Sequence, residues 1–282
     1  MNLSLSVRIA EDFSSKETAS ITLESLATLA TASGYSALCM RASQVGVHSG
    51  PAAAQEAASV VRKSGLTVSM VTGDFDIVYN NAAGPNCLRK IKPYLDLALA
   101  LDAPLIRVAL KTEEDISWAQ RAADEAAERG LQLVHQCHTQ SLFETVDGID
   151  RTLSRIARPN FGLIYEPANL ELCGQGYRHE TIQRLAPWIF NVYLQNQMLK
   201  PDGKLSLTTW CRGPIPFDLI SIHQPGGIDF ASVFDGLARV GYRGPVTVHQ
   251  SQTPGEPVSE SIRRTAEYLT ALARQTGFDP GP

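Results

Sequence analysis

The segment EEDISWAQRAADEAAERGLQLV, residues 113–134, contains the unit on which the fold of this chain depends. Residues 113–129 are good helix formers with apolar residues at helical spacing, and the apolar run 131–134 is short enough for a buried strand. Gly130 stands between them, and glycine commonly ends a helix; three other helical runs end in the same way, at Gly34, Gly65 and Gly241. The segment therefore predicts a helix followed directly by a strand.

This unit repeats along the whole chain. The expected strands are eight apolar runs at 3–9, 36–40, 66–72, 105–110, 131–134, 161–165, 189–194 and 246–248. The expected helices cover 16–32, 52–63, 88–101, 113–129, 144–156, 179–186, 230–240 and 256–275. Repeated βα units make the strands parallel, and eight of them close into a barrel. We expect an α/β chain with a single (β/α)8 TIM barrel domain over residues 1–282, with an open doubly wound sheet as the alternative.

The longest step between strands contains residues 198–227, which are rich in proline and glycine. Loops of this length in compact domains are usually lids, binding loops or packing arms. We expect this excursion to lie over the catalytic face or to pack against a second subunit.

Composition excludes several classes of function. The chain has 282 residues, and 25 Lys+Arg against 29 Asp+Glu give a formal net charge of −4, without a basic run for nucleic acid or a membrane surface. We expect no secretion signal, because residues 1–8 lack a basic segment followed by an apolar stretch, and no apolar segment is long enough for a bilayer. Its five cysteines are an odd number without Cys-x-x-Cys spacing, which favours reduced thiols. We expect a cytoplasmic protein whose partner is a small molecule.

Polar residues are most numerous after the last four expected strands. In a (β/α)8 barrel the active site lies at the C-terminal ends of the strands. These ends read His-Gln-Cys-His at 135–138, Tyr-Glu-Pro-Ala-Asn at 165–169, Tyr-Leu-Gln-Asn-Gln at 193–197 and His-Gln-Ser-Gln at 249–252. We therefore expect the second half of the barrel to carry most of the site.

These strand ends resemble the xylose isomerase-like barrels, the superfamily of sugar isomerases and sugar-phosphate epimerases, across nearly the whole chain. In that family the fifth strand ends in Glu-x-His, the sixth in Asp-Pro-x-His or Asp-Pro-x-Asn, the seventh in His-x-Lys-Asp and the eighth in Glu. Four of those side chains hold one divalent metal. The corresponding stretches here are 136–138, 166–169, 193–196 and His249, and the runs 225–230 and 241–245 also resemble the family's approach to its eighth strand.

The resemblance implies a metal site made of Gln136, Glu166, Gln195 and His249. Only one of these residues is a carboxylate, whereas Mg²⁺ prefers anionic oxygen ligands. We therefore expect Mn, Zn, Fe or Co rather than Mg at this site. A histidine on the eighth strand also resembles the barrel subunit of the C-glycoside deglycosidases, which act on 3-keto sugars.

The chemistry of this family assigns roles to the remaining polar residues. Moving a hydrogen beside a carbonyl requires a base, and because Gln136 cannot accept a proton we expect Glu166 and His138 to be catalytic. The residues expected to bind the substrate are Arg41, Lys111, Asn169, Tyr193, Asn196 and Trp210. Simpler interpretations stay open: a turn residue at His138, an ion pair of Glu166 with Arg41 or Lys111, and a lid anchor at Trp210.

The sequence thus predicts a metal-dependent sugar isomerase or epimerase that abstracts a proton next to the carbonyl of a polyhydroxylated sugar or keto-sugar. One alternative is a keto-sugar lyase similar to the deglycosidase subunit, and another is a sugar-binding barrel that has lost catalysis together with two metal carboxylates. Without a basic cluster beside a glycine-rich loop, the sequence favours an unphosphorylated substrate. A homodimer is left open.

Overall fold

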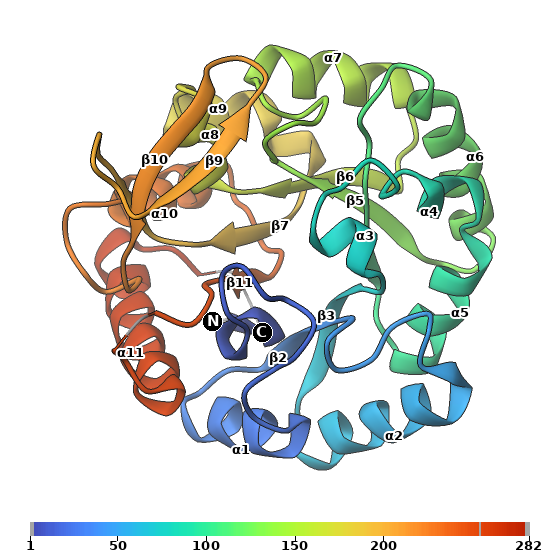
Figure 1. The fold of residues 1–282 in the computed structure, drawn as a ribbon, viewed down its shortest axis with the longest axis horizontal. Coiled ribbons are helices and arrows are strands. Elements are labelled where there is room, and N and C mark those ends of the chain that lie inside the picture. The colour runs from blue at the N-terminus through green and yellow to red at the C-terminus, as the bar shows by residue number, and fades with distance from the viewer. Residues whose placement is uncertain (1–2, 254, 280–282) are drawn as a thin grey trace.

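The computed structural model describes residues 3–253 and 255–279, and within them eight parallel strands form a closed barrel (Figure 1). The strands follow one another around the barrel in the order β1-β11-β7-β6-β5-β4-β3-β2. Their bounds are β1 Leu3–Ser6, β2 Ala37–Arg41, β3 Thr67–Thr72, β4 Leu105–Val108, β5 Gln132–Gln136, β6 Phe161–Tyr165, β7 Ile189–Leu194 and β11 Val246–Val248. The barrel is the one predicted from the βα repeat; residues 1–2, 254 and 280–282 of the predicted domain lie outside the described residues.

Eight longer helices form the outer ring in Figure 1. They are α1 Leu23–Ala32, α2 Gly50–Lys63, α5 Lys92–Leu101, α6 Asp115–Ala127, α7 Val146–Ile156, α9 His179–Leu185, α10 Phe230–Arg239 and α11 Val258–Thr276. Shorter helical turns are η1 Val7–Ala10, α3 Phe75–Val78, α4 Asn86–Arg89, α8 Pro167–Leu172 and η2 Ala186–Trp188. The expected glycine turns are confirmed, since Gly130 has φ +69° and Gly34, Gly65 and Gly241 are also left-handed.

Two elements of the N-terminal part are shorter than predicted. The expected strand 3–9 ends at Ser6, because Val7–Ala10 turns into a 3-10 helix whose Arg8 backbone N–H donates to the Ser6 hydroxyl. The expected helix 16–32 begins at Leu23, because the Thr22 hydroxyl caps it by accepting the N–H of Ser25. Residues 11–22 are thereby left as a loop.

The fourth strand is also shorter than the predicted run 105–110, since β4 ends at Val108. Beyond it the N–H groups of Lys111 and Thr112 donate to the Asp115 carboxylate, at 2.9 and 2.8 Å, and turn the chain into α6. The expected helix 88–101 is divided into α4 and α5, with Pro93 in the first turn of α5.

The excursion after the seventh strand forms a separate sheet. Strands β8 Gln197–Leu199, β9 Leu205–Thr209 and β10 Gly213–Leu219 pair antiparallel in the order β8-β10-β9. In Figure 1 the β9–β10 hairpin stands to one side of the barrel, near α8 and α9. Ser206, Leu207 and Thr208 of β9 line a pocket at the barrel mouth. None of the helices in the described part of the chain has an apolar stretch long enough to span a bilayer.

The inside of the barrel contains a small apolar layer. Its members come from six strands and are Cys39, Met70, Leu105, Val134, Ile164 and Tyr193. A larger apolar core packs the helices against the outside of the strands. The inner layer is the floor on which the site rests.

Candidate active site

A pocket of about 310 Å³ lies above the inner apolar layer, on the carboxyl side of the strands. Side chains of a parallel barrel alternate between inside and outside, so the second residue after a floor residue again points inward. Arg41, Arg107, Gln136, Glu166 and Gln195 each stand two positions beyond a floor residue, and all five line the pocket. The next layer of inward-facing side chains above the apolar floor is therefore charged and polar.

Glu166 is a buried carboxylate at the end of β6. Its Oε2 accepts hydrogen bonds from the Gln136 and Asn169 side-chain amides, the second at 2.5 Å. Burial raises the pKa of Glu166 to about 7, although the Gln136 hydrogen bond and the nearby Arg107 oppose the rise. At neutral pH this carboxyl group is therefore present in both protonated and ionised forms.

Two histidines line the same pocket. His249 stacks on Tyr193 with ring centroids 3.8 Å apart, and its Nδ1 lies 3.1 Å from the Ser6 hydroxyl. His138 is partly buried, with Nδ1 3.0 Å from the Thr139 carbonyl. Burial lowers the pKa of both rings well below the usual value, so both are neutral at pH ~7.

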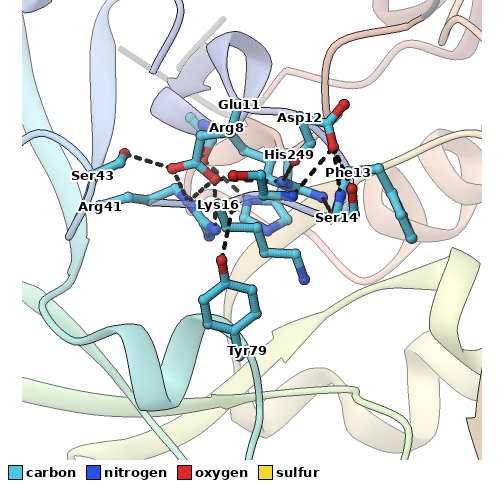
Figure 2. Close-up of polar contacts among 12 residues, drawn as sticks. Arg8, Glu11, Asp12, Phe13, Ser14, Lys16, Arg41, Ser43, Tyr79 and His249 are labelled. Carbon is cyan, nitrogen blue, oxygen red and sulfur yellow. Dashed lines mark hydrogen bonds and ion pairs between the residues drawn. The ribbon is translucent and has the colours of Figure 1, made fainter. Parts of the chain in front are cut away.

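A cationic network lies beside His249 in the same pocket (Figure 2). Glu11, fully buried, accepts from Arg41 Nε at 2.9 Å and from the Ser43 hydroxyl at 2.6 Å, and Arg8 Nη1 lies 3.4 Å from its Oε2 (Figure 2). Arg8 also donates to the backbone carbonyl of Asp12 at 2.7 Å. One carboxylate thus serves two guanidinium groups, and Arg41 Nη1 is buried without a hydrogen-bond partner.

Two more cations line the pocket with no carboxylate bonded to them. Arg107 is 3% exposed, its Nε is buried without a partner, and its guanidinium donates no hydrogen bond to any described residue. The Lys16 ammonium lies 5.8 Å from the centre of the Phe13 ring and 5.5 Å from that of Tyr79. Burial, followed by the charges of Arg8, Arg41 and Arg107, lowers the pKa of Lys16 to about 7.

The predicted site residues divide into two groups. Those that line the pocket are Arg41, Gln136, His138, Glu166, Asn169, Gln195 and His249. Glu166 does not pair with Arg41 or Lys111, because Arg41 is bonded to Glu11 and Lys111 Nζ donates to the Gln140 carbonyl.

Four predicted substrate contacts do not line the pocket: Lys111, Tyr193, Asn196 and Trp210. Tyr193 is part of the floor, with its hydroxyl 3.3 Å from the Cys39 sulfur. Asn196 binds backbone groups, donating to the Ser221 carbonyl and accepting from the N–H of Ile228. Trp210 is 56% exposed, near the Lys111 ammonium.

Arg8, Lys16 and Arg107 line the pocket but were not among the predicted residues. A signal for Arg107 was present in the sequence, since a charged residue inside an apolar strand run must face the barrel interior or be solvated. Arg8 offered the same signal in the first strand.

The predicted metal ligands lie together, but their chemistry does not fit a divalent cation. Gln136 directs its Nε2–H at Glu166, which leaves its Oε1 buried without a partner, and Glu166 is the only carboxylate among the pocket-lining residues. Three guanidinium groups and an ammonium surround this donor set, and they would repel a dication. Within the described residues, the only close group of three His, Cys or carboxylate ligands is Glu144, Cys173 and Cys211, outside this pocket.

Comparison with known proteins agrees with the fold. The chain belongs to the xylose isomerase-like TIM barrel family, whose model matches residues 27–272. The resemblance seen in the strand ends is thereby confirmed.

Two curated relatives are each 26% identical to this chain. The inosose dehydratase of Geobacillus thermodenitrificans aligns over 148 residues, which are 51% of this chain and 49% of that protein. The rhizopine catabolism protein MocC of Rhizobium meliloti aligns over 181 residues, 61% of this chain and 54% of that protein. The chain thus spans about half the length of the curated relatives it matches.

Solved structures share the fold at low identity. A xylose isomerase domain protein from Planctomyces limnophilus has a TM-score of 0.72 and 18% identity, with 98% of both chains covered. A xylose isomerase-like barrel from Mycobacterium smegmatis in complex with magnesium has a TM-score of 0.69 at 12% identity, covering 98% of this chain and 97% of that one. The IOLI protein with a bound zinc atom has a TM-score of 0.70 at 13% identity, covering 98% and 99%. Divalent metals therefore occur in barrels of this fold.

Proposed function

We propose that this chain is a sugar-modifying enzyme that removes a proton from a carbon next to a carbonyl, with Glu166 as the base. The observation that carries the proposal is the position of Glu166, a buried carboxylate held by two amides in a pocket at the carboxyl end of the barrel. The relatives named as an inosose dehydratase and a rhizopine catabolism protein support a polyhydroxylated ring or keto-sugar as the substrate.

The surroundings of Glu166 suit it to moving a proton in both directions. A base is most effective when its pKa is near the working pH, and burial raises the pKa of Glu166 to about 7. The Gln136 and Asn169 amides both donate to Oε2 and so fix the orientation of the carboxyl group. Within the described residues Oε1 accepts no hydrogen bond, and we assign this oxygen to the substrate proton.

Proton abstraction beside a carbonyl leaves negative charge on the carbonyl oxygen, and a positive group must stabilise it. We assign this role to Arg107, whose charge acts on Glu166 and whose guanidinium has free donors. Barrels of this fold have been found with magnesium and with zinc. In this pocket the guanidinium and ammonium groups would repel such an ion, and Arg107 supplies the positive charge instead.

The direction of the reaction after proton removal separates the candidate activities. Return of the proton to the opposite face or to the neighbouring carbon gives epimerisation or isomerisation. Loss of a hydroxide from the next carbon gives dehydration, the lyase alternative, and the inosose dehydratase relative favours this second candidate. We assign the proton for the leaving hydroxyl to Glu166, which holds the proton taken from carbon, so that the hydroxyl departs as water. His138 and His249 are neutral, and we assign them to hydrogen bonds with the substrate hydroxyls.

The test is hydrogen exchange with solvent. The purified chain is incubated in D₂O with inosose, fructose, fructose 6-phosphate and fructuronate, and deuterium at carbon next to the carbonyl is followed by NMR and mass spectrometry. Replacing Glu166→Gln should slow exchange by ~10²–10⁴-fold. The matched control is Glu171→Gln, a half-buried carboxyl five residues further on that does not line the pocket.

Equal rates for the Glu166→Gln and unmodified chains would overturn the assignment of the base. Absence of exchange with every compound would favour the remaining alternative, a sugar-binding barrel without catalysis.

A further inference from the structure

The charge in the pocket is larger than the proposed reaction needs. Three guanidinium groups, those of Arg8, Arg41 and Arg107, face the two carboxylates Glu11 and Glu166, so these five groups carry a net charge of +1. Protonated Lys16 raises this to +2. When Glu166 accepts the proton it loses its own charge as the oxyanion gains one, so the proposed reaction leaves this positive charge unbalanced.

The donors of these cations are not all used inside the protein. Arg41 Nη1 and Arg107 Nε are buried without hydrogen-bond partners, although both side chains are at least 97% buried. An unpaired buried charged donor is costly, so such donors are normally satisfied by a protein group, water or a ligand. The unmatched donors lie in the lining of the same pocket as Glu166.

We infer that the substrate carries a permanent anionic group, a carboxylate or a phosphate, which Lys16, Arg41 and Arg107 hold beside Glu166. The inference rests on the proposed function and gives its substrate class: a sugar acid or sugar phosphate rather than a neutral sugar. The sequence favoured an unphosphorylated substrate. A carboxylate agrees with that preference, whereas a phosphate would contradict it. A phosphate dianion would match the charge of +2, and a carboxylate would match half of it.

Lys16 is the residue on which the inference can be tested with least risk to the fold. It lies in the loop 11–22, its ammonium makes no hydrogen bond or salt bridge to a described residue, and its ring contacts involve Phe13 and Tyr79 at the edge of the pocket. Arg107 is more central but is also assigned to the reacting oxygen, and Arg41 is tied to Glu11.

The experiment uses three ligands that differ only at carbon six: fructose, fructuronate and fructose 6-phosphate. Their binding to the full chain is measured by isothermal titration calorimetry, with oxalate and inorganic phosphate as minimal anions. We expect one of the two anionic sugars to bind at least about tenfold more tightly than fructose, since hydrogen bonds to charged groups are the strong ones. The anion preferred identifies the group as carboxylate or phosphate.

Variants locate the binding. Lys16→Met should weaken binding of the preferred anion by about tenfold while leaving fructose binding unchanged. Lys63→Met removes the same charge from an exposed position on α2 and should have no effect. Arg107→Lys keeps the charge but loses the planar array of donors, and it should also weaken binding of the preferred anion.

Three results would overturn the inference: fructose bound as tightly as both anionic sugars, anion binding unchanged in Lys16→Met and Arg107→Lys, or no binding of any of the five compounds. Deuterium exchange with fructose alone would also overturn it while the proposed function stands. Anion binding without exchange would instead overturn the proposed function and leave the anion site in place.

Discussion

Replacing Glu11→Gln should destabilise the protein far more than the loss of an ordinary surface charge. Glu11 is fully buried and is the carboxylate shared by Arg8, Arg41 and Ser43. Burial alone would raise its pKa, but Arg41 and the other partners reverse that effect and hold the pKa below the usual value. The glutamine has nearly the same shape but leaves two buried guanidinium groups without a counter-charge.

The magnitude follows from these contacts. Removing one partner of a buried ion pair costs about 3–5 kcal/mol, because the remaining charge stays buried and unpaired. For a chain of this size each kcal/mol lowers Tm by a little under about 2 °C, so we expect a decrease of roughly 5–8 °C. Calorimetric melting and urea unfolding at neutral pH measure the effect. Both readouts are needed because the melting temperature alone does not give the free energy of unfolding.

The matched control is Asp235→Asn, which removes the carboxylate of the exposed helical pair with Arg239. Such pairs contribute about 0.3–0.5 kcal/mol. A double variant, Glu11→Gln with Arg41→Met, should recover part of the loss, since it removes the unpaired charge of Arg41. Equal destabilisation by Glu11→Gln and Asp235→Asn would refute the view that Glu11 holds the cationic side of the pocket together.

Three further predictions concern pH, metals and thiols. In a Glu166→Gln background, affinity for the preferred anion should fall as the pH rises from ~6 to ~8.5, because Lys16 loses its charge over this range. Burial and the neighbouring arginines lower the pKa of Lys16 to about 7. Adding Lys16→Met should make the affinity independent of pH over the same range. Dialysis against EDTA should leave exchange activity unchanged, and a loss that is restored by Mn²⁺ or Zn²⁺ would contradict the metal-free assignment. A thiol reagent should label one cysteine of the native chain, Cys211, since the other four are buried; mass spectrometry of Cys211→Ser checks this.

The sequence predicted the barrel well because its signals are local and repeated. Each βα unit combines a helical period, a glycine turn and a short apolar strand, and eight such units leave few other topologies. The pocket residues Gln136, Glu166 and His249 were also predicted, since they lie at the end of a strand or directly after it, and these strand ends were predicted within two residues.

The missed cations have a common cause, which is the prediction of overlong elements. Arg8 was placed inside a strand expected to end at residue 9, Arg107 inside one expected to end at 110, and Lys16 at the start of a helix. The strands β1 and β4 in fact end at Ser6 and Val108, so Arg8 and Arg107 lie at the barrel mouth. Side-chain capping and turn contacts determine the residues at which these elements begin and end, and the spacing of apolar residues does not reveal those contacts.

Trp210 and Lys111 were expected in the site but do not line the pocket, because their positions in the sequence do not determine where their side chains point. Both follow strand or loop patterns that do not fix a direction for the side chain, and tertiary contacts turn them away from the pocket. The loop 11–22 has the same property, since its path over the barrel mouth depends on contacts such as that of the Lys16 N–H with the Tyr79 hydroxyl.

The small sheet β8-β10-β9 brings side chains to the pocket on strands that the barrel does not need for its closure. Its strands bond to one another, so the hydrogen-bond ladder that closes the barrel does not depend on them. Yet Ser206, Leu207 and Thr208 form part of the pocket wall. Exchange of these three side chains can therefore change which molecules are accepted while the buried charges beneath them, and the fold that holds them, stay the same. For an engineer, β9 is the position at which a library would alter selectivity with the least loss of folded protein.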